Sequence, residues 1–163
     1  MTSAAIVPLT DGQKRIARHL VHGATIDVIA DREKVSRSTV RSHLGSIRAN
    51  LNCPPRATRP VTVHALLTHG QVPRPPAPRP DIDLDSAEQL LLRAHAEHSH
   101  PTAVVAAAEI APGNLRTKTR ALTAKTGAAN TTHLIGIGRA LGLLSPAAPK
   151  KPGRTGETAE AGR

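Results

Sequence analysis

Aromatic residues are absent from this chain, and sulfur is scarce. The 163 residues include no Phe, Tyr or Trp, one cysteine and one methionine. Without aromatic side chains the core must be built from Leu, Ile, Val and Ala, which small helical bundles pack more readily than sheets do. The usual stacking platforms for single-stranded nucleic acid are also missing. Because the lone Cys53 cannot form an internal disulfide, nothing in the composition suits an oxidising compartment.

Signals for export and for membranes are lacking too. Residues 1–7 have no basic region and too short an apolar run for a signal peptide. The apolar stretch 134–144 is broken by Arg139, well short of the roughly 20 residues that a membrane-spanning helix needs. We therefore expect a cytoplasmic protein that has no membrane partner.

Acidic residues are few relative to basic ones. The chain holds 22 Lys or Arg against 12 Asp or Glu, a formal net charge of +10. Such a charge raises both the association rate with polyanions and the affinity for a phosphate backbone. Residues 1–72 carry ten basic and four acidic residues, whereas residues 81–145 carry six of each. The composition thus favours a nucleic-acid partner, bound mainly by the first part of the chain.

Proline divides the chain into two blocks. Residues 73–80 hold five prolines in eight positions, which excludes a helix and favours an extended polyproline II strut. Residues 146–163 lack apolar periodicity and are typical of a disordered basic tail. The sequence therefore predicts an all-α protein with two small modules of four helices each, at 1–72 and 81–145, joined by the Pro-rich linker 73–80.

Capping residues and glycines place the helices of both modules. Thr10 with Gln13, and Asp85 with Glu88, have the spacing of capping boxes at the start of a helix. Together with the apolar periodicity they predict, in the first module, a helix between Thr10 and Gly23, one over about 26–33, one that starts at the cap Ser36 and one over about 61–68. In the second module they predict a helix that opens at Asp85, one over 102–108, one from Pro112 that Gly127 closes, and a final helix that Gly142 closes.

The second module repeats the order of the first. A shift of 75 positions superposes Leu9 on Leu84, Gln13 on Glu88, Val35 on Ile110, Val40 on Leu115, Arg41 on Arg116 and Ile47 on Leu122. We interpret this register as an internal duplication, with about three extra residues in the first module between Arg56 and Gly70. A chance resemblance between two Ala-rich helical segments is the alternative.

The segment 35–51 combines two different helix faces. Val40, Leu44, Ile47 and Leu51 form one apolar stripe, while the arginines and the small residues fall elsewhere. One face can therefore anchor in a core while the other lies in a DNA groove. The matching segment 113–129 contains four basic residues and no acidic one, so basic side chains gather there as well. Simple solvation of a helix face is the alternative for both segments.

These residues resemble a known family of DNA-binding domains. Leu9-Thr10 with Gln13, Ile29-Ala30, Val35-Ser36, Thr39-Val40-Arg41, His43, Ile47 and Leu51 look like the LuxR-type, or GerE-type, helix-turn-helix of bacterial regulators. The resemblance covers about residues 8–72 and, more faintly, 83–144. It implies four helices per module, with the third helix in the major groove and the fourth often used for pairing.

The resemblance also implies which residues contact DNA. It places base-edge contacts on Arg41, Ser42 and Gly45, and on Arg116, Thr117 and Arg120 in the second module. Gly45 departs from the family because it has no side chain to read a base. Asn50 departs as well, since a backbone-gripping Lys is usual there, which Lys125 supplies in the second module. The full set of predicted DNA-binding residues is Arg37, Ser38, Thr39, Arg41, Ser42, Gly45, Arg48, Asn114, Arg116, Thr117, Lys118, Arg120 and Lys125.

These features predict a sequence-specific protein of double-stranded DNA, most simply a bacterial transcriptional regulator associated with the nucleoid. Its two modules would act as a pseudo-dimer on half-sites about 34 to 36 Å apart, and the linker could span roughly 25 Å between them. A homodimer formed through the last helix of a module is a further expectation. Two other functions stay open: an architectural or replicon-maintenance protein of low sequence specificity, and an adaptor whose second module binds polymerase or another regulator.

Nothing in the sequence indicates an enzyme, a cofactor or a small-molecule ligand. His95, Glu97, His98 and His100 resemble a metal cluster, but no matching Cys or carboxylate pattern accompanies them, so a polar helix end is the better interpretation. There is no phosphate-cradling glycine loop and no paired acid and base.

Overall fold

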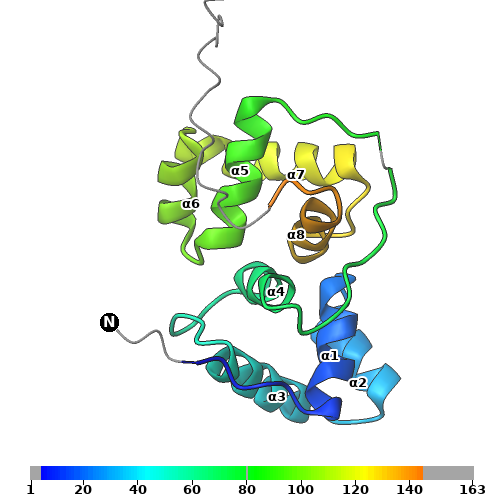
Figure 1. Ribbon diagram of the computed structural model, residues 1–163. Coiled ribbons are helices and arrows are strands. Elements are labelled where there is room, and N and C mark those ends of the chain that lie inside the picture. Colours follow the sequence, from blue (N-terminus) through cyan, green and yellow to red (C-terminus); the bar gives the residue numbers. More distant parts are fainter. Residues whose placement is uncertain (1–4, 80, 145–163) are drawn as a thin grey trace, which may run out of the picture.

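All the regular structure in the described part of this chain is helical. The computed structural model describes residues 5–79 and 81–144, and the predicted tail at 146–163 lies outside these residues. Within them the all-α prediction is confirmed, with eight α-helices, one 3-10 turn and no strand (Figure 1). The helices are α1 Asp11–Val21, α2 Ile26–Glu33, α3 Arg37–Asn50, α4 Arg59–Thr68, α5 Ser86–Glu97, α6 Pro101–Ala108, α7 Leu115–Thr126 and α8 Thr131–Ala140, and the 3-10 turn η1 is Pro112–Asn114.

Both predicted capping boxes are confirmed. The Thr10 hydroxyl accepts a hydrogen bond from the backbone N–H of Gln13 at 3.2 Å, and the Gln13 side chain accepts one from the Thr10 backbone at 3.0 Å. Asp85 and Glu88 make the same reciprocal pair at 2.8 and 2.9 Å. Each box satisfies two backbone donors that the first turn of a helix leaves free, which fixes where α1 and α5 begin.

The helices α1–α4, here called the first half, correspond in order to α5–α8, the second half, and in backbone detail around the second helix of each. A shift of 75 positions carries α2 onto α6 residue for residue. Lys34 and Glu109, which end these two helices, are equivalent and both adopt the left-handed conformation. The next backbone N–H in each half bonds to an equivalent carbonyl, Val35 to Ala30 at 3.0 Å and Ile110 to Val105 at 3.3 Å.

The last helix of each half follows a shift of 72 positions instead. The shift of 75 still relates the bond from Cys53 to Arg48 with that from Ala128 to Thr123, both at 2.9 Å. From the caps Thr58 and Asn130 onward, α4 and α8 have the same length and differ by 72. The three extra residues of the first half therefore lie within 54–57, which begins two residues before the predicted interval 56–70 and overlaps its start.

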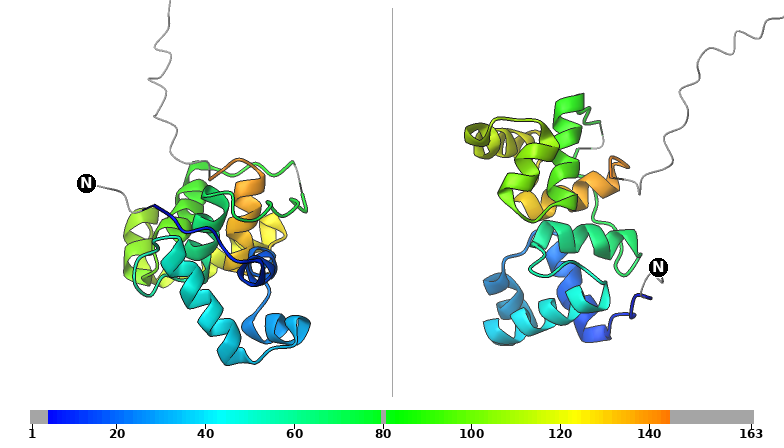
Figure 2. Two further views of the ribbon diagram at one scale, coloured as in Figure 1. Left: turned by 60° about the horizontal axis from the view of Figure 1, so that its bottom comes forward. Right: turned by 90° about the vertical axis from the view of Figure 1, so that its left-hand side faces the viewer.

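The two halves pack directly against each other. Helices α4 and α8 lie side by side at the centre, while α4 also contacts α5, and α1 contacts α8 (Figures 1 and 2). Most of the buried apolar residues of both halves belong to one continuous cluster. Residues 73–79 form neither helix nor strand, as their prolines predict, but Pro75 is buried against α8 near Gly136. This segment therefore contacts α8 as well as joining the two halves.

Two contacts between the halves occupy similar places in the two halves. The backbone N–H of Thr58, which caps α4, donates to the Ser99 hydroxyl just before α6 at 3.0 Å. The Asn130 amide, which caps α8, donates to the carbonyl of Gly23 just before α2 at 2.7 Å. Each half therefore offers the start of its fourth helix to the turn before the other half's second helix.

Arg139 and Leu67 mark the centre of this arrangement. They are equivalent under the shift of 72, and they contact each other, since Arg139 Nη2 donates to the Leu67 carbonyl at 3.2 Å. A residue that meets its own equivalent lies on an axis of two-fold symmetry. The interface between the halves is therefore isologous in kind, as in a symmetric dimer, although both partners belong to one chain.

Candidate nucleic-acid interface

Helix α3 is anchored by its cap and by its apolar face. The Ser36 hydroxyl accepts from the backbone N–H of Thr39 at 3.1 Å and also bonds to the hydroxyls of Ser38 and Thr39 at 2.9 and 2.8 Å. The predicted apolar stripe is confirmed, because Val40, Leu44, Ile47 and Leu51 are all buried. This burial fixes which side of α3 is left for solvent.

The opposite side of α3 is open. Arg41, Ser42, Gly45 and Ser46 are exposed, and a Cβ built at Gly45 would meet no atom within 4 Å. Arg41 has no carboxylate partner within the described residues. Arg37 does have one, as its Nε lies 2.6 Å from Asp27 Oδ1, but both side chains are more than half exposed. Such a pair contributes little to stability, so this arginine can exchange its partner for a phosphate.

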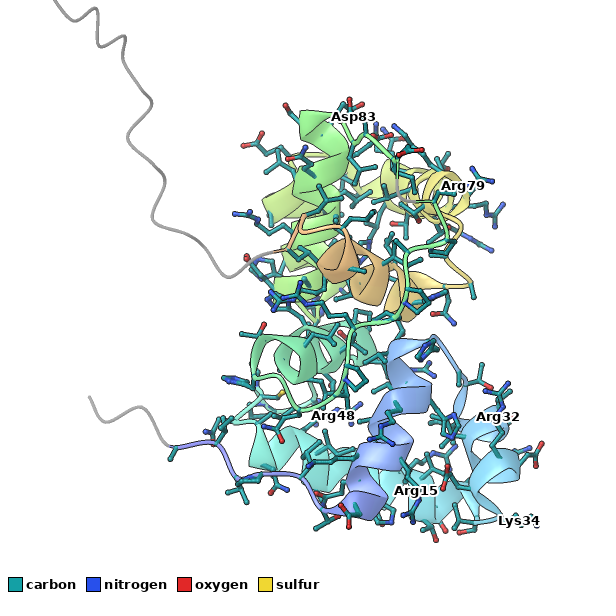
Figure 3. The ribbon with its side chains drawn as sticks, turned by 45° about the vertical axis from the view of Figure 1, so that its right-hand side comes forward. Arg15, Arg32, Lys34, Arg48, Arg79 and Asp83 are labelled. Carbon is teal, nitrogen blue, oxygen red and sulfur yellow. The ribbon has the colours of Figure 1, made fainter. Side chains whose placement is uncertain are left out.

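Arg48 lies apart from this open face. Its Nε donates to the Thr62 hydroxyl of α4 at 3.2 Å, and Figure 3 shows the side chain beside α4. Burial lowers the pKa of the Arg48 guanidinium, and the neighbouring positive charge of Arg59 lowers it further. Thr39 also differs from the other predicted residues, because it is half-buried within the Ser36 cap.

The matching helix of the second half begins differently. The sequence predicted Pro112 as the first helical residue, but Pro112–Asn114 form the 3-10 turn η1 and α7 starts at Leu115. Ala111 stands where the first half has Ser36, so no hydroxyl caps this start. The predicted contacts Asn114, Arg116, Thr117 and Arg120 are all exposed.

Two predicted lysines of the second half face acidic groups. Lys125 Nζ lies 2.8 Å from Glu88 Oε2, and this hydrogen bond raises the pKa of the lysine. Lys118 lines a small groove together with Asp85 and Glu88. The structure therefore separates these two lysines from Arg116 and Arg120, which line a different groove.

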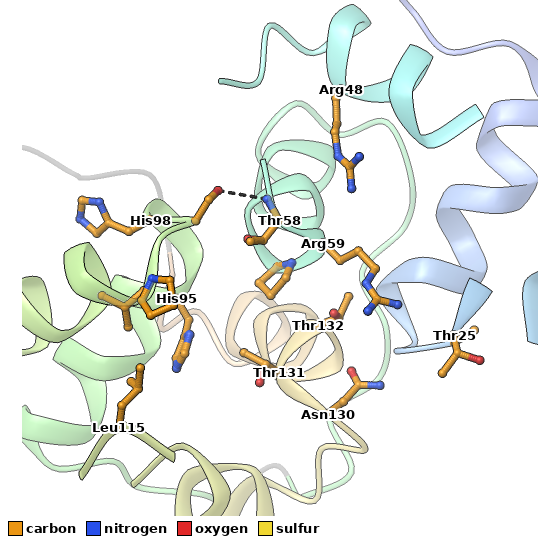
Figure 4. Close-up of a pocket in the computed structure, with 15 residues that line it drawn as sticks. Thr25, Arg48, Thr58, Arg59, His95, His98, Leu115, Asn130, Thr131 and Thr132 are labelled. Carbon is orange, nitrogen blue, oxygen red and sulfur yellow. Dashed lines mark hydrogen bonds between the residues drawn. The ribbon is translucent and has the colours of Figure 1, made fainter. Parts of the chain in front are cut away.

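A cleft between the halves carries residues that the sequence analysis missed. It has a volume of about 660 Å³ and no carboxylate among the described residues that line it (Figure 4). The lining residues are Ala24, Thr25, Arg48, Thr58, Arg59, Pro60, His95, His98, Ser99, Pro101, Val104, Leu115, Asn130, Thr131 and Thr132. Arg59 and Asn130 had no local signal, because they meet only where the two halves pack.

A second groove continues this cleft along α7. It has a volume of about 580 Å³ and contains both Arg116 and Arg120. It shares His95, Leu115, Asn130 and Thr131 with the cleft between the halves. The exposed arginines of α7 therefore border a hollow that adjoins the one lined by Arg48 and Arg59.

No family model, curated protein or solved structure matches this chain. Its function must therefore be argued from the geometry above. None of the described helices combines the length and the apolar character needed to cross a bilayer. The histidines singled out in the sequence gather into no metal-binding group within the described residues, and His95 Nε2 instead pairs with the Thr119 hydroxyl at 2.9 Å.

Proposed function

We propose that this protein binds double-stranded DNA in a sequence-specific manner, as a bacterial transcriptional regulator with two helix-turn-helix modules in one chain. The observation that carries the proposal is the open face of α3, where Arg41 and Ser42 are exposed while the apolar back of the helix is buried. An exposed arginine on such a helix can pair with guanine N7 and O6 in the major groove. The resemblance of residues 8–72 to the LuxR-type domain favours the same function.

The packing of the halves supports a pseudo-dimer. The paired contacts of Thr58 and Asn130 relate the starts of α4 and α8, and α3 precedes the first of these helices as α7 precedes the second. In dimeric helix-turn-helix proteins the two-fold symmetry of the protein is mirrored in the binding site. We therefore propose inverted half-sites rather than direct repeats. Because Arg41 and Gly45 face the first half-site and Arg116 and Arg120 the second, the two half-sites differ in sequence.

Alanine substitutions on the two helices test this function. A preferred duplex is first selected from random DNA, and Arg41→Ala and Arg116→Ala are then compared with the wild type by mobility shift. Each substitution is expected to cost about 1 to 3 kcal/mol of discrimination at its own half-site. Arg93→Ala is the matched control, since Arg93 is exposed on α5 and lines neither groove. If neither reading-helix variant binds more weakly than the control, the proposal is wrong.

One observation favours a second candidate function. Gly45 lies at the centre of the open face and offers no side chain to a base. An architectural protein that grips the phosphate backbone would need none there. Competition with random DNA at several salt concentrations separates the two candidates, because a regulator should keep a specificity ratio of about 10³ or more.

A further inference from the structure

The cleft on the pseudo-two-fold axis concentrates positive charge without compensation. Arg48 lines it from α3 and Arg59 from the start of α4, and Figure 4 shows both side chains among the residues around the cleft. Both arginines belong to the lining of this one cleft. Neither has a carboxylate partner within the described residues. Two like charges held together in this way favour an anion between them.

Helix starts add to this positive potential. Helices α4, α6 and α8 all begin at the cleft, since Arg59, Pro101 and Thr131 line it. None of the three carries an acidic residue in its first turn. The partial positive charge at a helix start is therefore not neutralised by an acidic side chain of the first turn at any of the three. This arrangement adds to the attraction for an anion that the arginines already provide.

The shape of the hollow indicates an extended ligand. The cleft adjoins the groove of Arg116 and Arg120, because four residues line both. The cationic path thus runs from the axis of the molecule to the exposed side of α7. An anion that follows this path is a chain of phosphate groups rather than a single ion.

We propose that the axis cleft binds backbone phosphates of the DNA segment that joins the two half-sites. This inference rests on the proposed function and adds to it a contact surface outside the reading helices. In this arrangement Arg48 and Arg59 supply the charge, and the threonine hydroxyls and backbone N–H groups at the start of α8 supply further donors. The central base pairs are then held without being read, which fixes the spacing of the half-sites.

The test compares the salt dependence of DNA binding on two duplexes. One duplex of about 30 base pairs spans both half-sites and the centre, and one of about 12 base pairs covers a single half-site. On the long duplex Arg59→Ala is expected to reduce the slope of log K against log salt by about 1, because one phosphate contact is lost. On the short duplex the same variant should match the wild type. Arg59→Lys should restore the slope, since it keeps the charge.

Controls distinguish the failure of this inference from the failure of the proposed function. Arg93→Ala serves again as the matched surface arginine, and circular dichroism verifies that each variant is folded. If Arg59→Ala matches Arg93→Ala on the long duplex while Arg41→Ala binds weakly, the cleft does not contact DNA and the proposed function stands. If the wild type binds no duplex at low salt, both proposals are overturned.

A final arm tests a small phosphorylated ligand in place of DNA. Inorganic pyrophosphate is added to the wild type and to Arg59→Ala, and thermal unfolding is followed. If the cleft binds DNA, pyrophosphate should raise the unfolding temperature of the wild type no more than that of Arg59→Ala. This holds at pyrophosphate concentrations too low to compete with the long duplex. If pyrophosphate stabilises only the wild type, and Arg59→Ala binds the long duplex as the wild type does, the inference is wrong. The ligand of the cleft is then a free phosphate compound and not the DNA backbone.

Discussion

The two halves have the same order of helices but begin their third helix in different ways. In the first half Ser36 caps α3 and joins a small network of hydroxyl groups. In the second half Ala111 and Pro112 replace Ser36 and Arg37, and the first turn becomes the 3-10 segment η1. A tighter turn thus takes the place of the missing cap. The fold tolerates the loss of a capping group as long as the apolar face of the helix stays buried.

The two halves also differ in how their basic side chains are paired. The first half leaves Arg41 unpaired and sends Arg48 and Arg59 into the axis cleft, whereas the second half neutralises Lys125 with Glu88. In the first half the same place is occupied by Asn50, whose amide donates to the Gln13 side chain at 3.2 Å. An uncharged brace in one half therefore corresponds to an ion pair in the other. We expect the first half to provide most of the phosphate affinity.

The largest effect is expected at the contact between the halves. A Cβ at Gly136 would lie 2.6 Å from the carbonyl oxygen of Val21 and 2.9 Å from Pro75. Gly136→Ala should therefore force α8 away from α1 and lower the free energy of unfolding by about 1 to 3 kcal/mol. Urea unfolding measures the change. Gly45→Ala is the control, because it has free space and should be stabilising by up to about 1 kcal/mol.

The difference in capping can be exchanged between the halves. Ser36→Ala removes the acceptor for the Thr39 N–H and should lower the free energy of unfolding by about 1 kcal/mol. Ala111→Ser introduces the missing hydroxyl at the equivalent position and should restore part of that amount if the 3-10 turn converts to α-helix. Thermal unfolding of both variants and of the double variant measures this. Equal stability of Ser36→Ala and the wild type would contradict the role of the cap.

Acid should affect the second half through His95. Burial lowers the pKa of His95, whereas the equivalent residue of the first half is the buried Leu20. Because the folded state binds this proton less readily than the unfolded state, stability should fall as the pH drops below the ordinary histidine pKa of about 6.5. His95→Leu should lose less stability than the wild type between about pH 7.5 and pH 5.5. His69→Asn, at an exposed position, should behave as the wild type does.

The smallest expected effect concerns Lys125. Glu88→Gln keeps the hydrogen-bonded cap of α5 but removes the charge that holds the lysine at 2.8 Å. The released lysine should become available to a phosphate, which would steepen the salt dependence of DNA binding by about 1 in log–log slope. Titration with duplex DNA measures this slope. The double variant Glu88→Gln with Lys125→Ala should return to the wild-type slope. If its slope stays steeper than that of the wild type, another residue causes the effect.

Local signals in the sequence were sufficient for the helices and their register. Capping boxes, glycines and the apolar stripe of α3 act within one or two turns, so their spacing predicts a helix before any packing is known. The start of α7 was misplaced because proline at 112 is compatible with both an α-helix and a 3-10 turn, and only the missing hydroxyl at Ala111 decides between them. The exposed positions of Arg41, Arg116 and Arg120 followed from the apolar face opposite each of them.

The features that the sequence did not indicate all depend on packing between the halves. Arg59 and Asn130 are separated by most of the second half, and their approach requires α4 and α8 to lie together. Arg48 was assigned to the open face of α3, whereas its hydrogen bond to Thr62 directs it toward α4. The prolines of 73–79 predicted the absence of a helix but not the burial of Pro75. A periodic pattern describes one element, and it contains no information about which second element will cover it.

The contact of Arg139 with Leu67 has a consequence for how the sequence of such a molecule can evolve. In a homodimer any substitution beside the axis occurs in both subunits at once, so a bulky side chain must be tolerated twice. Here the equivalent places hold different residues, as His64 and Gly136 do under the shift of 72. Each side of the axis can therefore mutate alone. Two halves joined in one chain can thus come to bind a partner whose two ends differ, which an assembly of identical subunits could not distinguish.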